Sequence, residues 1–390
     1  MTASLHRKTK RAGLYVHIPF CPQHCPYCGF AVVAGRRSSH ERYVDAVCRE
    51  LACRGEEIQG LFATVYFGGG TPSRLEAPHL SRILETADST CGIAADCEIT
   101  MEANPGREDS ARFGDFRKIG FNRISIGAQS FRDSCLKKLG RLHSAVDAEA
   151  AFESARRAGF ASVNLDLIFA VPGVPRSDWQ GTLDTVIRLS PDHVSTYSLT
   201  IEEGTRLEKQ VASGRVRPQS EDEEAEQFSL GIEALSRAGY EQYEVSNFAR
   251  PGHRCRHNSA YWSRGEYLGV GMSAHSHLKG VRSWNRAGLH EYIGAVEGGD
   301  SPAAGQEFID PSTGNRERLF LGLRTRDGVA LSKGERLRLW NQLKGVPLVT
   351  EGYLEMGDSH MRLTPKGMPV ADAISVEMAE LFEHCSREPA

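Results

Sequence analysis

Residues 15–30 read YVHIPFCPQHCPYCGF, and three of the ten cysteines of the chain lie in this stretch. Cys21, Cys25 and Cys28 have the spacing C-x3-C-x2-C, directly after a run that is typical of a β-strand. A tight loop of this kind can direct three thiolates at one iron–sulfur cubane and leave one iron without a protein ligand. A structural zinc site with His17 or His24 as the fourth ligand is the alternative.

Short β-branched or aromatic runs recur after this first strand, with helical patterns between them. They begin at Leu14, Ala63, Glu98, Arg123, Ser162 and His193. The alternation predicts parallel strands joined by crossover helices, which is an α/β fold. About six such units favour a partial (β/α)6 barrel of TIM type over a flat, doubly wound sheet.

The unusual sequences of the chain fall at the carboxyl ends of these predicted strands. HIPFC follows the first strand, and GGGTP, EANPG, GAQSF and AVPG follow the next four. Parallel-barrel enzymes carry their chemistry at this end of the strands. We therefore expect a functional site there, and this position favours a redox cluster over structural zinc.

Changes in composition predict four segments. They are a basic tail (1–13), a barrel with an extension (14–297), a linker rich in Gly, Pro, Ser and Asp (298–315) and a small C-terminal domain (316–390). The last segment contains two helical patterns and a hairpin-like element. It is therefore expected to be an α+β domain of winged-helix type.

The overall composition is that of a soluble globular protein. The chain has 390 residues, with 47 Lys and Arg against 50 Asp and Glu. A net charge of -3 gives no reason to expect nucleic acid as a partner. The sequence has no apolar run long enough to span a bilayer and no signal peptide, so we expect a cytoplasmic protein. Disulfides are not expected in that compartment, and the cysteine cluster calls for metal chemistry.

The sequence CPQHCPYC resembles the C-x3-C-x-aromatic-C signature of the radical S-adenosylmethionine (radical SAM) superfamily, with Tyr27 as the aromatic residue. The resemblance implies a [4Fe-4S] cluster on Cys21, Cys25 and Cys28. It also implies that S-adenosylmethionine (SAM) binds the open iron and is cleaved to a 5'-deoxyadenosyl radical. An electron donor is then required as a partner.

Later motifs resemble the coproporphyrinogen oxidase-like branch of this superfamily. The resemblance implies that SAM is surrounded by Tyr15, Gly69, Gly70, Thr71, Glu102, Gln129, Arg141 and Asp166. The planar fork of Arg141 suits the methionine carboxylate, and Glu102, Gln129 and Asp166 offer acceptors for ribose hydroxyls or the ammonium group. Taken singly, each of these polar residues is also typical of a cap, a turn or a solvated charge.

Two related branches differ at specific positions. The oxygen-independent coproporphyrinogen III oxidases carry a fourth cysteine two residues after the third and a longer N-terminal extension. This chain has Phe30 at that position, and fourteen residues precede Tyr15. Both features resemble the haem chaperone (HemW) branch instead. That branch implies haem as cargo and apo-haemoproteins, such as respiratory enzymes, as recipients; propionate decarboxylation to protoporphyrinogen IX is the alternative function.

The haem chaperone branch carries the motif H-N-x-x-Y-W, present here from His257 to Trp262. An imidazole can ligate haem iron, and aromatic rings such as Tyr261 and Trp262 can pack on the macrocycle. His257 is the leading axial-ligand candidate, and Cys255 is the thiolate alternative. His275 falls where the oxidase branch approaches the adenosine. The sequence leaves peripheral membrane contact, a homodimer and the identity of the client proteins open.

Overall fold

The computed structural model describes residues 11–387, which divide into two compact units. The first unit consists of the chain up to Gln227 and of the stretch Glu266–Phe308. The second unit consists of Phe228–Gly265 and Ile309–Ala390. Each unit is therefore built from two stretches that are separate in the sequence.

Six parallel strands form the centre of the first unit. In sheet order they are β1 (Arg11–Ile18), β4 (Leu61–Gly69), β5 (Ile93–Ala103), β6 (Arg123–Gln129), β7 (Ser162–Phe169) and β8 (His193–Ser198). Every neighbouring pair among them is parallel. Most of their apolar side chains are buried, as expected for a parallel sheet that is covered on both faces. The predicted α/β fold of partial-barrel type is confirmed.

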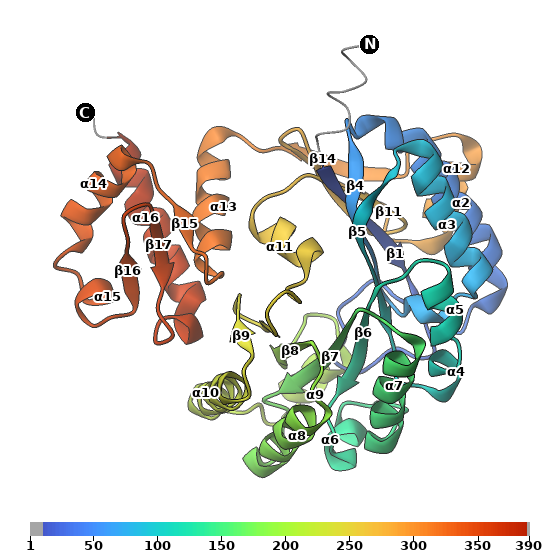
Figure 1. Ribbon diagram of the computed structural model, residues 1–390, viewed down its shortest axis with the longest axis horizontal. Helices are drawn as coiled ribbons and strands as arrows, with labels where there is room; N and C mark the ends of the chain where they lie inside the picture. Colours follow the sequence, from blue (N-terminus) through green and yellow to red (C-terminus); the bar gives the residue numbers. More distant parts are fainter. Residues whose placement is uncertain (1–10, 388–390) are drawn as a thin grey trace. The chain divides into compact units, whose positions relative to one another are not determined.

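Helices connect the parallel strands and lie outside them, as Figure 1 shows for α3, α5, α7 and α8. In chain order they are η1 (Arg37–Ser39), α2 (His40–Arg54), η2 (Gly55–Glu57), η3 (Pro72–Arg74), α3 (Ala77–Thr90), α4 (Arg107–Ser110), α5 (Phe113–Lys118), α6 (Asp133–Lys138), α7 (Ala145–Ala158) and α8 (Arg176–Leu189). Helices α9 (Arg206–Ala212) and α10 (Glu221–Arg237) follow β8, the last of the six strands. Helix α7 begins with a capping box of Ser144 and Asp147 and ends at Gly159, whose φ is 80°.

Strands β11 to β14 extend the sheet beyond β1. Strand β11 (Tyr267–Val270) pairs with β1 in parallel, and β12 (His275–Leu278), β13 (Val281–Asn285) and β14 (Ala303–Phe308) follow in antiparallel order. Helix α12 (Leu289–Gly298) separates β13 and β14. Two short strands, β2 (Phe20–Cys21) and β3 (Val33–Ala34), pair in parallel around the cysteine-bearing loop.

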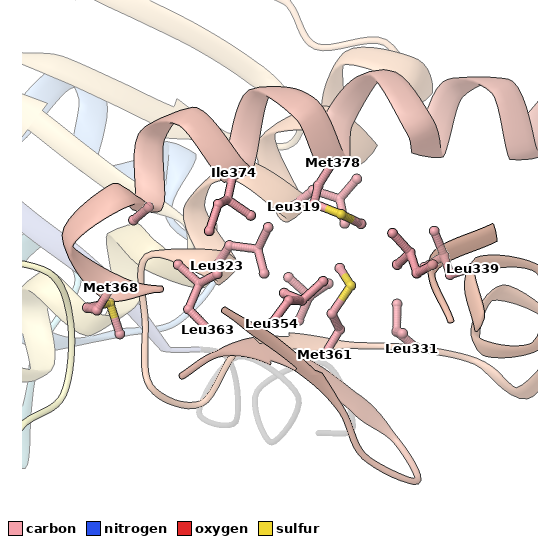
Figure 2. Packing of buried hydrophobic residues seen from close by; sticks show 13 residues of the cluster. Leu319, Leu323, Leu331, Leu339, Leu354, Met361, Leu363, Met368, Ile374 and Met378 are labelled. Carbon is pink, nitrogen blue, oxygen red and sulfur yellow. The ribbon is translucent and has the colours of Figure 1, made fainter. Parts of the chain in front are cut away.

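The second unit is α+β. Its elements after α10 are β9 (Glu241–Gln242), β10 (Asn247–Ala249), α11 (Arg256–Trp262), α13 (Pro311–Leu323), β15 (Val329–Ala330), α14 (Lys333–Leu343), α15 (Pro347–Thr350), β16 (Leu354–Met356), β17 (His360–Leu363), η4 (Met368–Val370) and α16 (Ala371–Arg387). Strands β15, β17 and β16 form an antiparallel sheet. Figure 2 shows the buried core between this sheet and the helices, where Leu319, Leu339 and Met378 are fully buried.

The structure differs from the predicted segment boundaries in three places. Residues 228–265, expected in the barrel segment 14–297, group with the C-terminal unit. The backbone of Val245 donates to that of Arg324 at 2.9 Å, which ties this stretch to the segment after α13. The expected linker 298–315 contains β14 and the start of α13. Strand β1 begins at Arg11, inside the expected tail 1–13, and residues 1–10 lie outside the described part of the chain.

Two general properties of the chain also follow from the structure. Within residues 11–387, the chain contains no helix of the length and apolar character that a bilayer span requires. Nine cysteines, from Cys21 to Cys255, are free thiols in the structure.

Candidate cluster and cofactor site

Among the three cysteines of the predicted cluster, Cys21 ends β2, and Cys25 and Cys28 lie on the loop between β2 and β3. Backbone bonds from Val33 to Pro19 at 2.8 Å and from Cys28 to Cys25 at 3.2 Å shape this loop. The thiols are close enough for a charge on Cys28 or Cys25 to raise the pKa of Cys21. Burial is the larger effect and raises the pKa of Cys21 to about 11. The thiol of Cys21 also lies 3.4 Å from Oγ1 of Thr71.

The histidines beside the loop make contacts that do not suit a zinc site. Nδ1 of His17 lies 3.1 Å from the hydroxyl of Tyr15, and its Nε2 lies 3.0 Å from the carbonyl oxygen of Ala31. Nε2 of His24 lies 2.9 Å from the carbonyl oxygen of Cys28. Among residues 11–387, no three His, Cys, Asp or Glu side chains, the three cysteines included, are grouped closely enough to hold a single metal ion. His17 is therefore not positioned as the fourth ligand of a zinc ion.

The glycine-rich turn after β4 packs against the start of the cysteine loop. Gly69 has a φ of 106°, and a Cβ at this position would collide with the ring of His17. A Cβ on Gly70 would lie 2.6 Å from the carbonyl oxygen of Pro19. The next residue, Thr71, is only 3% exposed. Only residues without a side chain allow this close approach, which brings the backbone of the turn beside the cysteines.

Arg141 places a positive charge next to the cysteines. Its Nη1 donates to the thiol sulfur of Cys25 at 3.6 Å, and its Nη2 donates to the carbonyl oxygen of Gly127 at 3.1 Å and to the side chain of Asn104. Arg141 also lies close enough to Tyr27 to oppose the rise in its pKa. Burial nevertheless raises the pKa of Tyr27 to about 12. The guanidinium is therefore held beside the cluster loop by groups from three segments.

Two carboxyl groups, those of Glu102 and Asp166, lie on strands β5 and β7. Glu102, on β5, accepts from the hydroxyl of Tyr66 at 2.8 Å and from the backbone N–H of Gly69 at 3.1 Å. Burial raises the pKa of Glu102 to about 7, and the charge of Asp166 acts in the same direction. Asp166, on β7, accepts from the hydroxyl of Ser125 at 2.8 Å. Burial raises the pKa of Asp166, and its hydrogen bonds oppose the rise.

Gln129 ends β6 with a φ of 62°, in the left-handed region that non-glycine residues rarely adopt. Ala170, directly after β7, has a φ of 57°. Such backbone conformations cost about 1–3 kcal/mol each and are concentrated at functional sites. The structure thus places Gly69, Glu102 and Gln129 at the carboxyl ends of their strands, as predicted.

These groups match the chemistry of the cofactors that the sequence implies. Three thiols can each bind one iron of a cubane. Two carboxylates and one guanidinium complement a ligand that carries a sulfonium, an ammonium and a carboxylate group. The glycine turn adds a backbone surface that a ligand can approach closely. The residues therefore fit a [4Fe-4S] cluster and SAM.

The H-N-x-x-Y-W motif forms helix α11 of the second unit. His257 is 1% exposed, and its Nε2 lies 2.7 Å from the hydroxyl of Tyr261. Burial lowers the pKa of His257 to about 3, so the imidazole is neutral at physiological pH. Trp262 lies under the guanidinium of Arg324, which is 5.9 Å from the ring centroid. Cys255, which precedes α11, is 2% exposed. The structure therefore groups the haem candidates with each other and buries both possible ligands.

Several contributors to the site were not expected from the sequence. Asn104 lies between the side chains of Thr71 and Arg141, and it donates to Oγ1 of Thr71 at 2.9 Å. Tyr66 holds Glu102. The signal for Asn104 was its position in EANPG, directly after β5, whereas Tyr66 lies within a strand pattern that carries no chemical signal. His275, a further candidate, is exposed and stacks on Trp284 at a centroid distance of 6.0 Å.

The cysteine triad, the glycine turn and the two carboxyl groups at one end of a partial parallel barrel are those expected of the radical SAM proteins. Comparison with known families agrees, because the model of the Radical SAM superfamily matches residues 15–186. A solved structure described as "Coproporphyrinogen III oxidase (HemN) from Escherichia coli is a Radical SAM enzyme" has a TM-score of 0.81 and 23% identity. It covers 98% of this chain and 92% of that chain, and at this identity it supports the fold alone.

Curated relatives narrow the class further. Heme chaperone HemW of Synechocystis sp. is 37% identical over 342 residues, which are 85% of this chain and 80% of that protein. Heme chaperone HemW of Mycobacterium tuberculosis is 34% identical over 366 residues, which are 93% of each chain. The chain belongs to the HemW family of the radical SAM superfamily. The resemblance to this branch, expected from Phe30 and the H-N-x-x-Y-W motif, is confirmed.

Proposed function

We propose that this protein is a haem chaperone that carries a [4Fe-4S] cluster, binds SAM and transfers haem to apo-haemoproteins such as respiratory enzymes. The observation that carries the proposal is the H-N-x-x-Y-W motif, which occurs in a chain that has Phe30 in place of a fourth cysteine. The relatives named Heme chaperone HemW support it.

In this proposal Cys21, Cys25 and Cys28 hold the cluster. When bound, the cluster and SAM supply one-electron chemistry that generates a carbon radical. The roles of the chain's own residues are to bind and orient. Arg141 meets the carboxylate of SAM, and the carboxyl groups of Glu102 and Asp166 meet its positive charges or its ribose hydroxyls. Tyr15, Gln129, Gly69, Gly70 and Thr71 line the same end of the strands.

His257 is the proposed axial ligand of haem, and Cys255 is the alternative. A neutral imidazole is the form that binds iron, and the lowered pKa of His257 keeps it in this form. Because Nε2 contacts Tyr261 and the ring is buried, ligation through this atom requires helix α11 to rearrange. Tyr261 and Trp262 are proposed to pack on the macrocycle.

A cysteine series tests the cluster. Replacing Cys21, Cys25 or Cys28 by Ala removes one of three thiolates, so stable iron binding should be lost. Cys53→Ala is the control, because Cys53 is exposed on α2 and lies outside this loop. Anaerobically reconstituted wild type should contain about four iron and four sulfide per chain. Equal iron in all variants, or one zinc in their place, would overturn the cluster assignment.

A haem titration tests the function. We expect wild type to bind haemin with a shifted Soret band and His257→Ala to bind about tenfold more weakly. The titration is followed by transfer to a haem-depleted cytochrome. If wild type binds no haem and instead forms protoporphyrinogen from coproporphyrinogen III in an anaerobic assay, the decarboxylase alternative is correct.

The remaining partners stay predictions. The proposed chemistry requires an electron donor for the cluster, and the cytoplasmic location is predicted from the sequence. Peripheral membrane contact and a homodimer are the two associations that the sequence leaves open. Co-sedimentation with vesicles and analytical ultracentrifugation of the reconstituted protein would measure the last two.

A further inference from the structure

A buried group of polar side chains lies behind Asp166, between strands β6, β7 and β8. Its centre is Asn164, which is 3% exposed and lies two residues before Asp166 on β7. Nδ2 of Asn164 lies 2.8 Å from Oδ1 of Asp166. The same nitrogen lies 2.6 Å from the hydroxyl of Ser125 and 2.9 Å from the hydroxyl of Ser195. None of these neighbours of Asp166 was singled out by the sequence.

The hydrogen-bond donors of this group all point the same way, from His193 through Asn164 toward Asp166. Ser125 donates to Oδ2 of Asp166 at 2.8 Å, so its hydroxyl oxygen is left to accept from Asn164. Oδ1 of Asn164 faces Nδ1 of His193 at 2.7 Å. The opposite orientation of the amide would place its oxygen against the carboxylate of Asp166, which would be repulsive. The imidazole of His193 therefore donates through Nδ1, and the donors of the group point toward Asp166.

A chain of donors of this kind stabilises a buried anion. Burial alone favours the neutral acid, and hydrogen bonds from Ser125, Ser195 and Asn164 lower the pKa of Asp166 against that effect. Other charges also face this carboxyl group. Arg123 on β6 favours the anion, and Glu102 on β5 disfavours it by like-charge repulsion. His193 on β8 contacts Asn164, which in turn contacts Asp166.

We propose that Asn164, with His193 behind it, is a positioning residue that fixes Asp166 as an oriented anion for binding the positively charged nucleoside cofactor. This inference rests on the proposed function, because the role of Asp166 in binding SAM belongs to it. Asn164 touches no cofactor in this proposal. It acts through the carboxylate, whose two oxygens are each anchored by a separate donor.

The test measures the dissociation constant of SAM for anaerobically reconstituted protein between pH 5.5 and 8.5. Asn164→Leu is close in size to the native residue and removes both the donor and the acceptor. Loss of these hydrogen bonds should raise the pKa of Asp166, so its carboxyl group stays protonated to a higher pH in this variant. We therefore expect about tenfold weaker binding of SAM at pH 6 and a smaller loss at pH 8.5. Asp166→Asn should weaken binding and lose this difference between the two pH values. Glu102 is present and titrates in every variant of this test, so the pH profile of SAM binding by each variant is compared with that of wild type.

Two further variants separate positioning from loss of packing. Thr182→Val removes a buried hydroxyl that bonds Ser130 at 3.1 Å, within the same unit and outside the group around Asn164. It should keep the wild-type affinity and pH profile. His193→Asn retains an N–H donor close to the position of Nδ1 and should bind like wild type, whereas His193→Leu should resemble Asn164→Leu. This pair decides the question if Asn164→Leu does not fold.

Each outcome has a distinct meaning. Wild-type affinity and pH profile in folded Asn164→Leu, or in His193→Leu, would overturn the inference and leave the proposed function intact. An equal loss of affinity at every pH would show a packing role and would also overturn it. If reconstituted wild type binds no SAM at all, the proposed function fails, and this inference fails with it.

Discussion

At the scale of single residues, the site depends on groups whose charge is set by burial. Glu102 is the clearest case, since burial raises its pKa to about 7 from an ordinary value of 4.5. A carboxyl group with a raised pKa stabilises the fold in its neutral form. This contribution is present below pH 4.5 and is lost as pH rises through about 7.

The expected result is a pH-dependent melting temperature. In the absence of SAM, wild type should lose several degrees between pH 4.5 and 7.5 relative to Glu102→Gln, which carries no titrating group at this position. Saturating SAM should restore more stability at pH 7.5 than at pH 5.5, because the ionised carboxylate meets a cation. Parallel curves for the two proteins, measured by differential scanning fluorimetry, would contradict this assignment.

The contact between His257 and Tyr261 leads to a second prediction at this scale. Tyr261→Phe keeps the ring and removes the hydroxyl that lies 2.7 Å from Nε2. A hydrogen bond of this kind contributes about 1 kcal/mol, so haemin should bind about fivefold more tightly if Nε2 is the iron ligand. Tyr353→Phe, elsewhere in the second unit, is the matched control. Weaker binding by Tyr261→Phe would show that the hydroxyl assists haem binding instead.

At the scale of elements, the glycine turn after β4 combines backbone strain with a close contact. Gly69→Ala places a Cβ at a φ of 106° and against the ring of His17. Gly35→Ala is the matched comparison, because Gly35 has a φ of 69° but no atom within 4 Å of the added Cβ. Gly35→Ala should cost about 1 kcal/mol of unfolding free energy, and Gly69→Ala should cost clearly more.

Urea denaturation measures this difference, and SAM titration gives a second readout. Gly69→Ala should weaken SAM binding, because the added side chain moves His17 and the turn. Gly35→Ala should leave SAM binding close to wild type. Equal unfolding free energies for the two variants would mean that the contact with His17 relaxes at no cost.

At the scale of the whole molecule, the two units have separate cores. Leu339 on α14 is fully buried in the core of the second unit (Figure 2), whereas Leu337 on the same helix is 64% exposed. Leu339→Ala should cost about 2–5 kcal/mol, and Leu337→Ala should cost less than about 0.5 kcal/mol. Iron content should not change in either variant, since the cysteines belong to the first unit. Loss of iron in Leu339→Ala would show that the units depend on each other.

Local sequence pattern predicted a large part of the first unit. The helical pattern in residues 39–59 corresponds to α2 (His40–Arg54) and the turn of η2, and the run from Ser162 corresponds to β7. These features depend on the periodicity of apolar residues and on short-range turns, which neighbours in the chain determine. The cysteine spacing is likewise a local feature, and it predicted a cluster site at the loop between β2 and β3.

Contacts between distant residues were beyond the reach of the sequence. The grouping of 228–265 with the C-terminal part depends on bonds such as that from Val245 to Arg324, which no local composition reveals. The burial of His257 and the direction of the hydrogen bonds around Asn164 depend on side chains from separate strands or helices. The printed sequence alone predicted the order of the six parallel strands and the position of the cysteine loop. The tertiary structure decided which polar groups are buried together and therefore which charges the site can hold, because burial and hydrogen bonding are properties of the packed chain.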